Sequence, residues 1–383
     1  MLQPGSTRPR VPRGRAQARP GVFPLSPLST AAFQPLPKPL GLPPYHFDLE
    51  TVLPGITHTA STLGKLVFHT VGDTGGIKNA DYQAAVAASM KGDLNNPDST
   101  RPQFFFHLGD VVYYNGEANQ YYPQFYEPYD HYGAPIIAIP GNHDGDPLSG
   151  QTSLDGWVRY FMTAQPHIDP VSADAPRVTL SLPNVYFTLN CPFVTIIGMY
   201  TNVPEGGSID SIQQQWLTNE FATAPEDKAL ILALHHPIYS FDDHHSGSAA
   251  MADAVQHAIN DSRRVPNLVL TAHVHNYQRI ERQLVTTGAA TPFLVAGAGG
   301  YYHLHGMTAA SGHVDPALGA KLIFHDEFHH GYVTLTVDAK NIFGLMTPLA
   351  STGAKGHQSD AKTDTFKYPA TLMKLPEGVT ISL

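Results

Sequence analysis

The segment LVFHTVGD, residues 66–73, begins as a short apolar run and ends in a Gly-Asp pair. The same order returns in FFFHLGD, residues 104–110. A third apolar run, IIAI at 136–139, is followed by PGNHD. A segment that can form a helix, residues 80–91, separates the first two runs. Short apolar runs that alternate with helices are typical of parallel strands covered on both faces.

The rest of the chain continues this alternation and then changes. Apolar residues recur on one helical face at Ile209, Ile212, Trp216, Leu217 and Phe221. The next predicted elements are a strand at 229–234, a helix at 249–258 and a strand at 267–270. Later strands, with no helices between them, are predicted at 293–295, 332–337 and 342–345. The pattern predicts an α/β fold, a two-sheet α/β/α (βαβαβ) sandwich with mixed sheets.

The composition excludes several classes of protein. The chain has 383 residues and a formal net charge of −9, so we expect no nucleic acid as a structural partner. Its apolar runs are far shorter than the ~18 residues that cross a bilayer, so we expect no membrane span. Cys191 is the single cysteine, which excludes an intramolecular disulfide and a cysteine-built zinc site.

The N-terminal segment differs from the rest in composition. Residues 1–47 contain no acidic residue, several arginines and many prolines. Such a composition favours a disordered or extended arm. We therefore divide the chain into a Pro-rich basic arm at 1–55 and a single folded domain at 56–383.

Predicted strand ends carry residue types that bind metal ions. They read GDTGG (72–76), GDVVY (109–113), GNHD (141–144), HHP (235–237) and AHVH (272–275). Ligands of open α/β sheets bind beyond the carboxyl ends of the strands. Two cations about 3.5–4 Å apart need a bridging carboxylate and a mixture of nitrogen and oxygen ligands. The sequence therefore predicts a two-metal hydrolytic site.

The order GD…GDxxY…GNH[DE]…HxP…HxH resembles that of the calcineurin-like metallophosphoesterases. The tyrosine three residues after the second aspartate resembles the purple acid phosphatases in particular. GDTGG is similar to the GDWGG of their small, tartrate-resistant type, and HVHNYQR is similar to the HVHxYER of the larger types. The resemblance covers residues 66–337 and implies the metallophosphoesterase sandwich.

The resemblance also implies two metal ions, Fe(III) and a divalent iron, zinc or manganese. It assigns the ferric site to Asp73, Tyr113 and His275, the divalent site to Asn142, His235 and His273, and the bridging position to Asp110. Most relatives that are not purple have Asp-x-His in the first motif, whereas this chain has Gly75. Tyr113 would replace the missing ligand, and a phenolate suits Fe(III) better than a neutral imidazole does.

Further histidines are candidates for catalysis. His143 follows Asn142 and, by resemblance, faces the substrate phosphate or the leaving group. His244 and His245 lie in a loop that in the family binds phosphate and protonates the leaving alcohol. The sequence SGS follows this pair as in bacterial relatives, which favours His245. An ordinary polar loop explains the pair equally well.

For function, the resemblance implies an acid phosphatase that hydrolyses small-molecule phosphate monoesters with a metal-bound hydroxide. A phosphodiesterase or nucleotidase on the same scaffold is the first alternative, because metal ligands do not separate a monoester from a diester. A catalytically inactive binding protein of the same fold is the second. The lack of a visible signal peptide and of disulfides favours the cytoplasm, whereas the resemblance favours a secreted or periplasmic protein.

Overall fold

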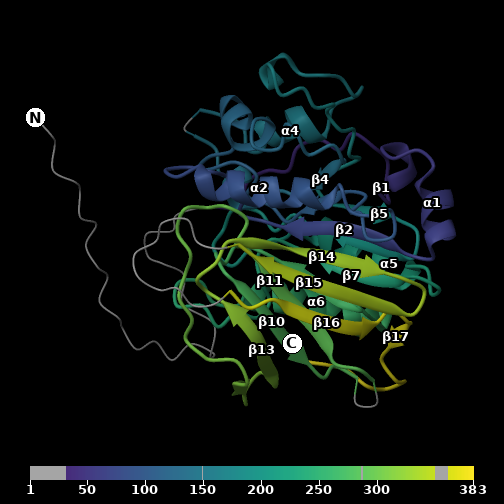
Figure 1. Cartoon of the computed structure of the whole chain (residues 1–383). Helices are drawn as coiled ribbons and strands as arrows, with labels where there is room; N and C mark the ends of the chain where they lie inside the picture. The colour runs from purple at the N-terminus through teal and green to yellow at the C-terminus, as the bar shows by residue number, and fades with distance from the viewer. Residues whose placement is uncertain (1–31, 149, 286–287, 350–360) are drawn as a thin grey trace, which may run out of the picture.

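In the computed structural model, two mixed β-sheets are flanked by helices (Figure 1). The structure describes residues 32–148, 150–285, 288–349 and 361–383. In spatial order, sheet A contains β1 (His46–Asp48), β5 (Phe187–Asn190), β6 (Val194–Gly198), β7 (Ala229–Ala233), β9 (Leu268–Thr271), β11 (Thr291–Ala296), β10 (Tyr277–Arg282), β13 (Ala320–Asp326) and β12 (Val314–Asp315). Sheet B contains β16 (Asp364–Pro369), β15 (Asn341–Pro348), β14 (Gly331–Val337), β2 (Leu66–Val71), β3 (Phe105–His107) and β4 (Ile136–Ala138). The predicted two-sheet α/β architecture is confirmed.

The helices and short turns connect these strands. The α-helices are α1 (Ile56–Leu63), α2 (Asp81–Asp93), α3 (Asn142–Gly145), α4 (Asp155–Phe161), α5 (Ser211–Thr223) and α6 (Ala249–Ser262). Shorter helical turns are η1 (Leu49–Thr51), η2 (Ala118–Gln120), η3 (Tyr122–Tyr126) and η4 (Pro170–Ser172), and a small ribbon joins β8 (Arg264–Val265) to β17 (Met373–Lys374). Within the described ranges, no helix combines the length and the apolar character that a membrane crossing requires.

Each sheet has a parallel part, and these parts carry the predicted site. Strands β2, β3 and β4 are parallel in sheet B, and β6, β7, β9 and β11 are parallel in sheet A. Every residue of β2 and β7 is buried, which explains their continuous runs without alternation. The residues that follow parallel strands lie at one edge of a sheet.

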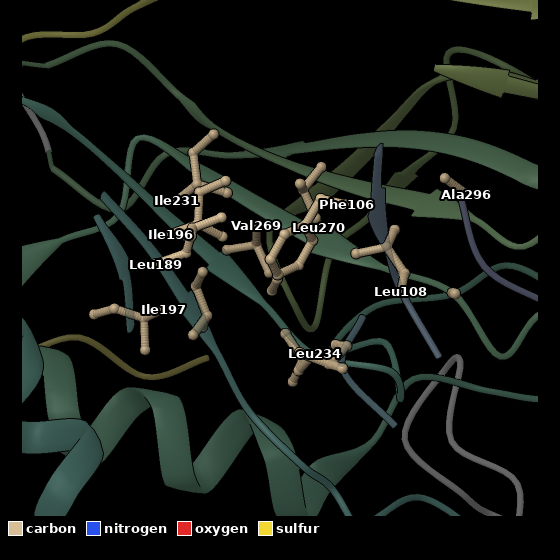
Figure 2. Packing of buried hydrophobic residues seen from close by; sticks show 14 of the residues in the cluster. Phe106, Leu108, Leu189, Ile196, Ile197, Ile231, Leu234, Val269, Leu270 and Ala296 are labelled. Atoms are coloured by element: carbon tan, nitrogen blue, oxygen red, sulfur yellow. The ribbon is translucent and has the colours of Figure 1, made fainter. Parts of the chain in front are cut away.

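The core lies between the two sheets. Figure 2 shows Phe106 of β3 beside Val269 and Leu270 of β9, all of them buried. A Cβ atom at Gly198 of β6 would lie 2.7 Å from Ile139 and 3.6 Å from the Phe106 ring. Because glycine lacks that atom, β6 can approach the strands of sheet B closely. This close packing fixes the position of the parallel strands of sheet A relative to those of sheet B.

The predicted apolar face of α5 was wrong in one position. Ile212 is 68% exposed, whereas Gln213 is buried. The Gln213 side chain accepts a hydrogen bond from the backbone N–H of Tyr200 at 3.0 Å and donates one to its carbonyl at 2.9 Å. A buried polar residue that is fully hydrogen-bonded replaces the apolar residue that the periodicity predicted.

The predicted arm is described from residue 32 onward, and residues 1–31 lie outside the described residues. Within it, β1 pairs in parallel with β5 at the edge of sheet A. The indole of Trp216 donates a hydrogen bond to the Pro44 carbonyl at 2.7 Å. Residues 46–55 thus take part in the sandwich, and the division at residue 55 stays a prediction.

A charged cluster joins the two sheets. Arg279 of β10 donates hydrogen bonds to both carboxylate oxygens of Asp364 in β16, at 2.7 and 2.9 Å. Tyr277 donates to the same carboxylate at 2.9 Å, and Asp364 is 4% exposed. Tyr277 is itself a buried core residue.

Replacing Asp364 with alanine is expected to lower the free energy of unfolding by about 3 kcal/mol, because the Arg279 guanidinium loses its main partner. Urea denaturation followed by circular dichroism measures this change. Thr365 lies on the exposed face of the same strand, and Thr365→Ala should change stability by less than about 1 kcal/mol. Equal losses in the two variants would contradict a special role of the ion pair.

Candidate metal centre

The candidate ligands gather where the parallel strands of both sheets end. Asp73 follows β2, Asp110 follows β3, and His235 follows β7. The backbone φ angles of Asp73, Asp110 and His273 are 54°, 54° and 65°, in the left-handed region that few residues adopt. Backbone held in this region is frequent at functional sites, because the surrounding structure must stabilise it.

Glycines let the backbone approach these carboxylates. A Cβ atom at Gly141 would lie 2.1 Å from Oδ1 of Asp110, and one at Gly297 would lie 2.7 Å from Oδ2 of Asp73. Any larger residue at either glycine would displace a candidate ligand.

The seven predicted ligands form one connected group. His235 Nε2 lies 3.4 Å from Asp110 Oδ2, 3.9 Å from Asp73 Oδ1 and 3.1 Å from Asn142 Oδ1. Asn142 Oδ1 lies 3.0 Å from His273 Nδ1. On the other side, the Tyr113 hydroxyl donates to Asp73 Oδ1 at 3.0 Å and lies 3.3 Å from His275 Nε2. The structure therefore brings together every residue for which the sequence predicts metal binding.

The donor set fits cations. His235 Nδ1 donates to the Leu108 carbonyl at 2.8 Å, so its Nε2 points toward the oxygens of the site. Metal-binding histidines typically anchor their second nitrogen in this way. Asp110 Oδ2 is buried and, within the described residues, makes no hydrogen bond besides its 3.4 Å contact with His235 Nε2. Buried carboxylate oxygens normally have closer donors, and a cation would satisfy this one.

The two buried aspartates and His235 shift one another's pKa. Asp73 and Asp110 are 0% and 1% exposed. Burial raises the pKa of Asp73 well above its usual range, and the neighbouring Asp110 adds to this rise. Burial would also raise the pKa of Asp110, but His235 and His143 outweigh it and lower that pKa. Against its own burial, His235 has its pKa raised to about 9, chiefly by Asp110. The contact between Asp110 and His235 at 3.4 Å is therefore a charged pair.

Asp144 connects two of the motifs. Its carboxylate accepts hydrogen bonds from the backbone N–H groups of Gly141 at 2.9 Å, Val111 at 3.1 Å and Val112 at 3.1 Å. Burial and the nearby Asp110 nevertheless raise its pKa to about 7. The bonds to Asp144 fix the loop after β3 against the start of α3.

Two of the three catalytic candidates lie beside the ligands. The His143 N–H donates to Asp110 Oδ1 at 2.9 Å, and the His143 ring lies 4.6 Å from that of Tyr113. The His245 ring lies 4.5 Å from that of His273. His244 instead stacks on His305 at 4.6 Å, and its Nδ1 lies 3.2 Å from Asp243.

A carboxylate that sequence reasoning missed lies between two of these imidazoles. Glu205 Oε1 lies 2.9 Å from His245 Nδ1 and 3.4 Å from His273 Nε2. Its hydrogen bond raises the pKa of His245, although burial opposes that rise. Burial and the nearby His245 lower the pKa of His273 to about 4, so the His273 ring is neutral. The candidate residues were sought at the ends of predicted strands. Glu205 follows β6, which was not predicted, so it was not among them.

A family model describes most of this site. Residues 67–277 match the family model "calcineurin-like phosphoesterase". The chain belongs to this family. The matched residues include the GD, GDxxY, GNHD, HxP and HxH motifs, whose side chains meet at the strand ends.

Relatives within this metallophosphoesterase family are distant. Tartrate-resistant acid phosphatase type 5 of Mus musculus is 24% identical over 212 residues, which are 50% of this chain and 62% of that protein. The enzyme of Rattus norvegicus is 24% identical over 208 residues, with the same coverage. The alignments thus span less than two thirds of the length of these curated relatives. The resemblance to tartrate-resistant and purple acid phosphatases is therefore a distant one.

Solved structures agree on the fold. Purple acid phosphatase PPD1 from yellow lupin (Lupinus luteus) superposes with a TM-score of 0.57 at 18% identity, covering 79% of this chain and 53% of that one. Plasmodium GAP50, described as the anchor in the inner membrane complex, superposes with a TM-score of 0.55 at 14% identity, covering 81% and 90%. At these identities the comparison shows the metallophosphoesterase sandwich alone.

The Tyr113 ring occupies the space that a side chain at position 75 would need. A Cβ atom at Gly75 would lie 2.6 Å from the Tyr113 ring and 2.5 Å from Gln124 Oε1. Tyr113 therefore fills the volume into which a longer residue at position 75 would project. The loss of the usual histidine and the presence of the tyrosine, which the sequence interpretation linked, are sterically coupled in this family member.

Gly75→Ala is expected to lower the free energy of unfolding by about 1–3 kcal/mol, because the added methyl group collides with Tyr113 and Gln124. Thermal and urea denaturation measure the change. Gly92 of α2 is the matched control, since a Cβ atom there meets nothing within 4 Å. Gly92→Ala should leave stability unchanged or raise it by about 0.5–1 kcal/mol. A tolerated Gly75→Ala would contradict the steric coupling.

Proposed function

We propose that this chain is an acid phosphatase that hydrolyses phosphate monoesters with two bound metal ions. The donor set around Asp110 carries the proposal: a buried carboxylate oxygen lies 3.4 Å from Nε2 of His235, and the Tyr113 hydroxyl contacts the neighbouring Asp73. Membership of the calcineurin-like phosphoesterases supports phosphoester hydrolysis. The distant similarity to tartrate-resistant acid phosphatases favours monoesters.

The residues divide into two ligand groups that share Asp110. Asp73, Tyr113 and His275 would hold Fe(III), and Asn142, His235 and His273 would hold a divalent iron, zinc or manganese ion. The phenol oxygen and the carboxylates are hard ligands that suit a trivalent ion. When bound, the two ions would supply an activated water nucleophile and neutralise the phosphoryl oxygens.

His143 and His245 would serve the substrate. His143 Nδ1 lies 2.8 Å from the Tyr114 carbonyl and His245 Nδ1 lies 2.9 Å from Glu205. With Nδ1–H donated to these acceptors, each ring keeps Nε2 free to bind a phosphoryl oxygen or protonate the leaving alcohol. His244 is the weaker candidate, because its side chain is 56% exposed and its ring stacks on His305.

The assignment of Tyr113 to a ferric ion predicts colour. Protein purified with iron should show a visible charge-transfer band from phenolate to Fe(III), and a reductant should change it. Elemental analysis of the same sample should give two metal ions per chain. Tyr113→Phe should remove the band. A colourless protein with two zinc or manganese ions would contradict the ferric assignment and leave the hydrolase proposal standing.

Turnover itself is tested with a monoester and a bis-ester of one chromogenic alcohol. The monoester should be the better substrate, and metal chelation should abolish its hydrolysis. Asp110→Asn and His143→Ala should each lower kcat/KM by at least about 100-fold, through lost metal bridging and lost acid catalysis. His257, an exposed histidine that pairs with Asp261 on α6, is the control, and His257→Ala should retain full activity.

Other outcomes of this assay would contradict the proposal in distinct ways. Preferred hydrolysis of the bis-ester would make the protein a phosphodiesterase. Turnover that survives both Asp110→Asn and His143→Ala would belong to a contaminant. A protein that binds metal and hydrolyses neither ester would be a binding protein on this scaffold.

A further inference from the structure

Glu205 lies outside the motifs that define the site. One of its carboxylate oxygens nevertheless contacts both a candidate metal ligand and a candidate substrate-binding histidine. Oε1 lies 3.4 Å from Nε2 of the candidate ligand His273 and 2.9 Å from Nδ1 of the substrate-side candidate His245. The Glu205 side chain is 31% exposed, and His273 is 6% exposed. A single carboxylate oxygen therefore touches two imidazoles with different proposed tasks.

The contact with His273 determines which of its nitrogens carries the proton. A neutral imidazole has one N–H group and one lone pair. His273 Nε2 faces the Glu205 carboxylate, and Nδ1 faces Asn142 Oδ1 at 3.0 Å. Since a carboxylate only accepts hydrogen bonds, the proton resides on Nε2 and the Nδ1 lone pair faces the ligand group. This is the tautomer that a metal ligand requires.

The contact with His245 fixes its ring. The backbone of His245 is already held, because its N–H donates to Asp242 Oδ1 at 2.6 Å and its carbonyl accepts from Ser240 Oγ at 3.0 Å. The ring packs against that of His273 at 4.5 Å, and the bond from Nδ1 to Glu205 adds a directional restraint that leaves Nε2 available to the substrate.

The loop that carries Glu205 is itself braced. Asn202 adopts a φ of 60°, and its side chain accepts from the Gln34 N–H at 2.7 Å and donates to the Gln34 carbonyl at 2.9 Å. The Gly206 carbonyl accepts from the hydroxyl of Ser248, which also caps α6. The Glu205 carboxylate is thus presented from a fixed backbone.

We propose that Glu205 is a positioning residue that sets the tautomer of His273 for metal binding and orients His245 toward the substrate. The role of His245 in this inference rests on the proposed phosphatase function, whereas the role of His273 concerns metal binding alone. Glu205 touches neither the substrate nor the reacting atoms, so it acts through the two imidazoles.

The experiment titrates metal-free protein with Zn²⁺ in competition with a chelator, and it needs no turnover. Wild type should bind two Zn²⁺ ions. Glu205→Ala should bind the weaker of the two with about 10- to 100-fold lower affinity, as is typical when a partner of a metal ligand is removed. Glu205→Gln should recover most of that affinity, because its amide oxygen can still accept from both rings. With a monoester, Glu205→Ala should lower kcat more than it changes KM.

Glu220 offers a matched control. It is a buried glutamate of α5 whose carboxylate lies 2.9 Å from His46 Nε2 and accepts from the Thr188 hydroxyl, so its partners belong to β1 and β5 and not to the ligand motifs. Glu220→Ala removes the same kind of pair and should leave the Zn²⁺ affinities within about 2-fold of wild type. An equal loss of affinity in Glu220→Ala would attribute the effect to general destabilisation and overturn the inference.

Three further results would overturn it. The first is a Glu205→Ala protein with the Zn²⁺ affinities of wild type. The second is a third Zn²⁺ ion in wild type that Glu205→Ala loses, since Glu205 would then be a ligand. The third is a Glu205→Gln protein as weak as Glu205→Ala, which would point to charge compensation. A wild-type protein that binds two Zn²⁺ ions without hydrolysing monoesters would refute the proposed function alone.

Discussion

The structure depends on the burial of two carboxylates next to one imidazole. Asp73 and Asp110 are almost completely buried, and both face His235 Nε2, at 3.9 and 3.4 Å. Each buried ion costs roughly several kcal/mol in lost hydration, so such a pair is stable only with compensating positive charge. Protonated His235 can provide part of that charge, and the proposed cations would provide more. The fold therefore presents the candidate metal ligands at the expense of its own stability.

The surrounding structure opposes this cost with rigid geometry. Left-handed backbone at both aspartates turns their side chains over the strand ends, and Gly141 and Gly297 admit the backbone beside them. Asp144 then ties the loop after β3 to α3 through three backbone N–H groups. None of these features binds a ligand, but together they prevent the carboxylates from moving apart or into solvent.

The sequence was sufficient to predict the parallel strands and the residues at their ends, because both signals are local. A buried strand is a continuous apolar run, and the candidate ligands are the next residues, as at β2 and Asp73. The signal fails where strands carry no such run. β13 was missed because its apolar residues are interrupted by the exposed Lys321 and by His325, and several of its residues are only partly buried. Glu205 was missed for a different reason: its partners lie 40 and 68 residues away, and only the tertiary fold brings them together.

Most imidazoles of the site are oriented by a hydrogen bond at one nitrogen. His235 uses the Leu108 carbonyl, His143 the Tyr114 carbonyl, and His245 uses Glu205. His275 differs, because its Nδ1 has no hydrogen-bond partner among the residues that the structure describes.

The orientation of His275 must then come from packing. Its ring lies 4.2 Å from that of Tyr301 and 4.5 Å from that of His305, and the His305 N–H donates to the His275 carbonyl at 2.9 Å. Tyr301 also lies 4.5 Å from the Tyr113 ring. The loop after β11 therefore packs against Tyr113 and His275, two of the three residues proposed for the ferric ion, although it contributes no ligand itself. In this chain, ring contacts from that loop orient His275, whereas hydrogen bonds orient His235, His143 and His245.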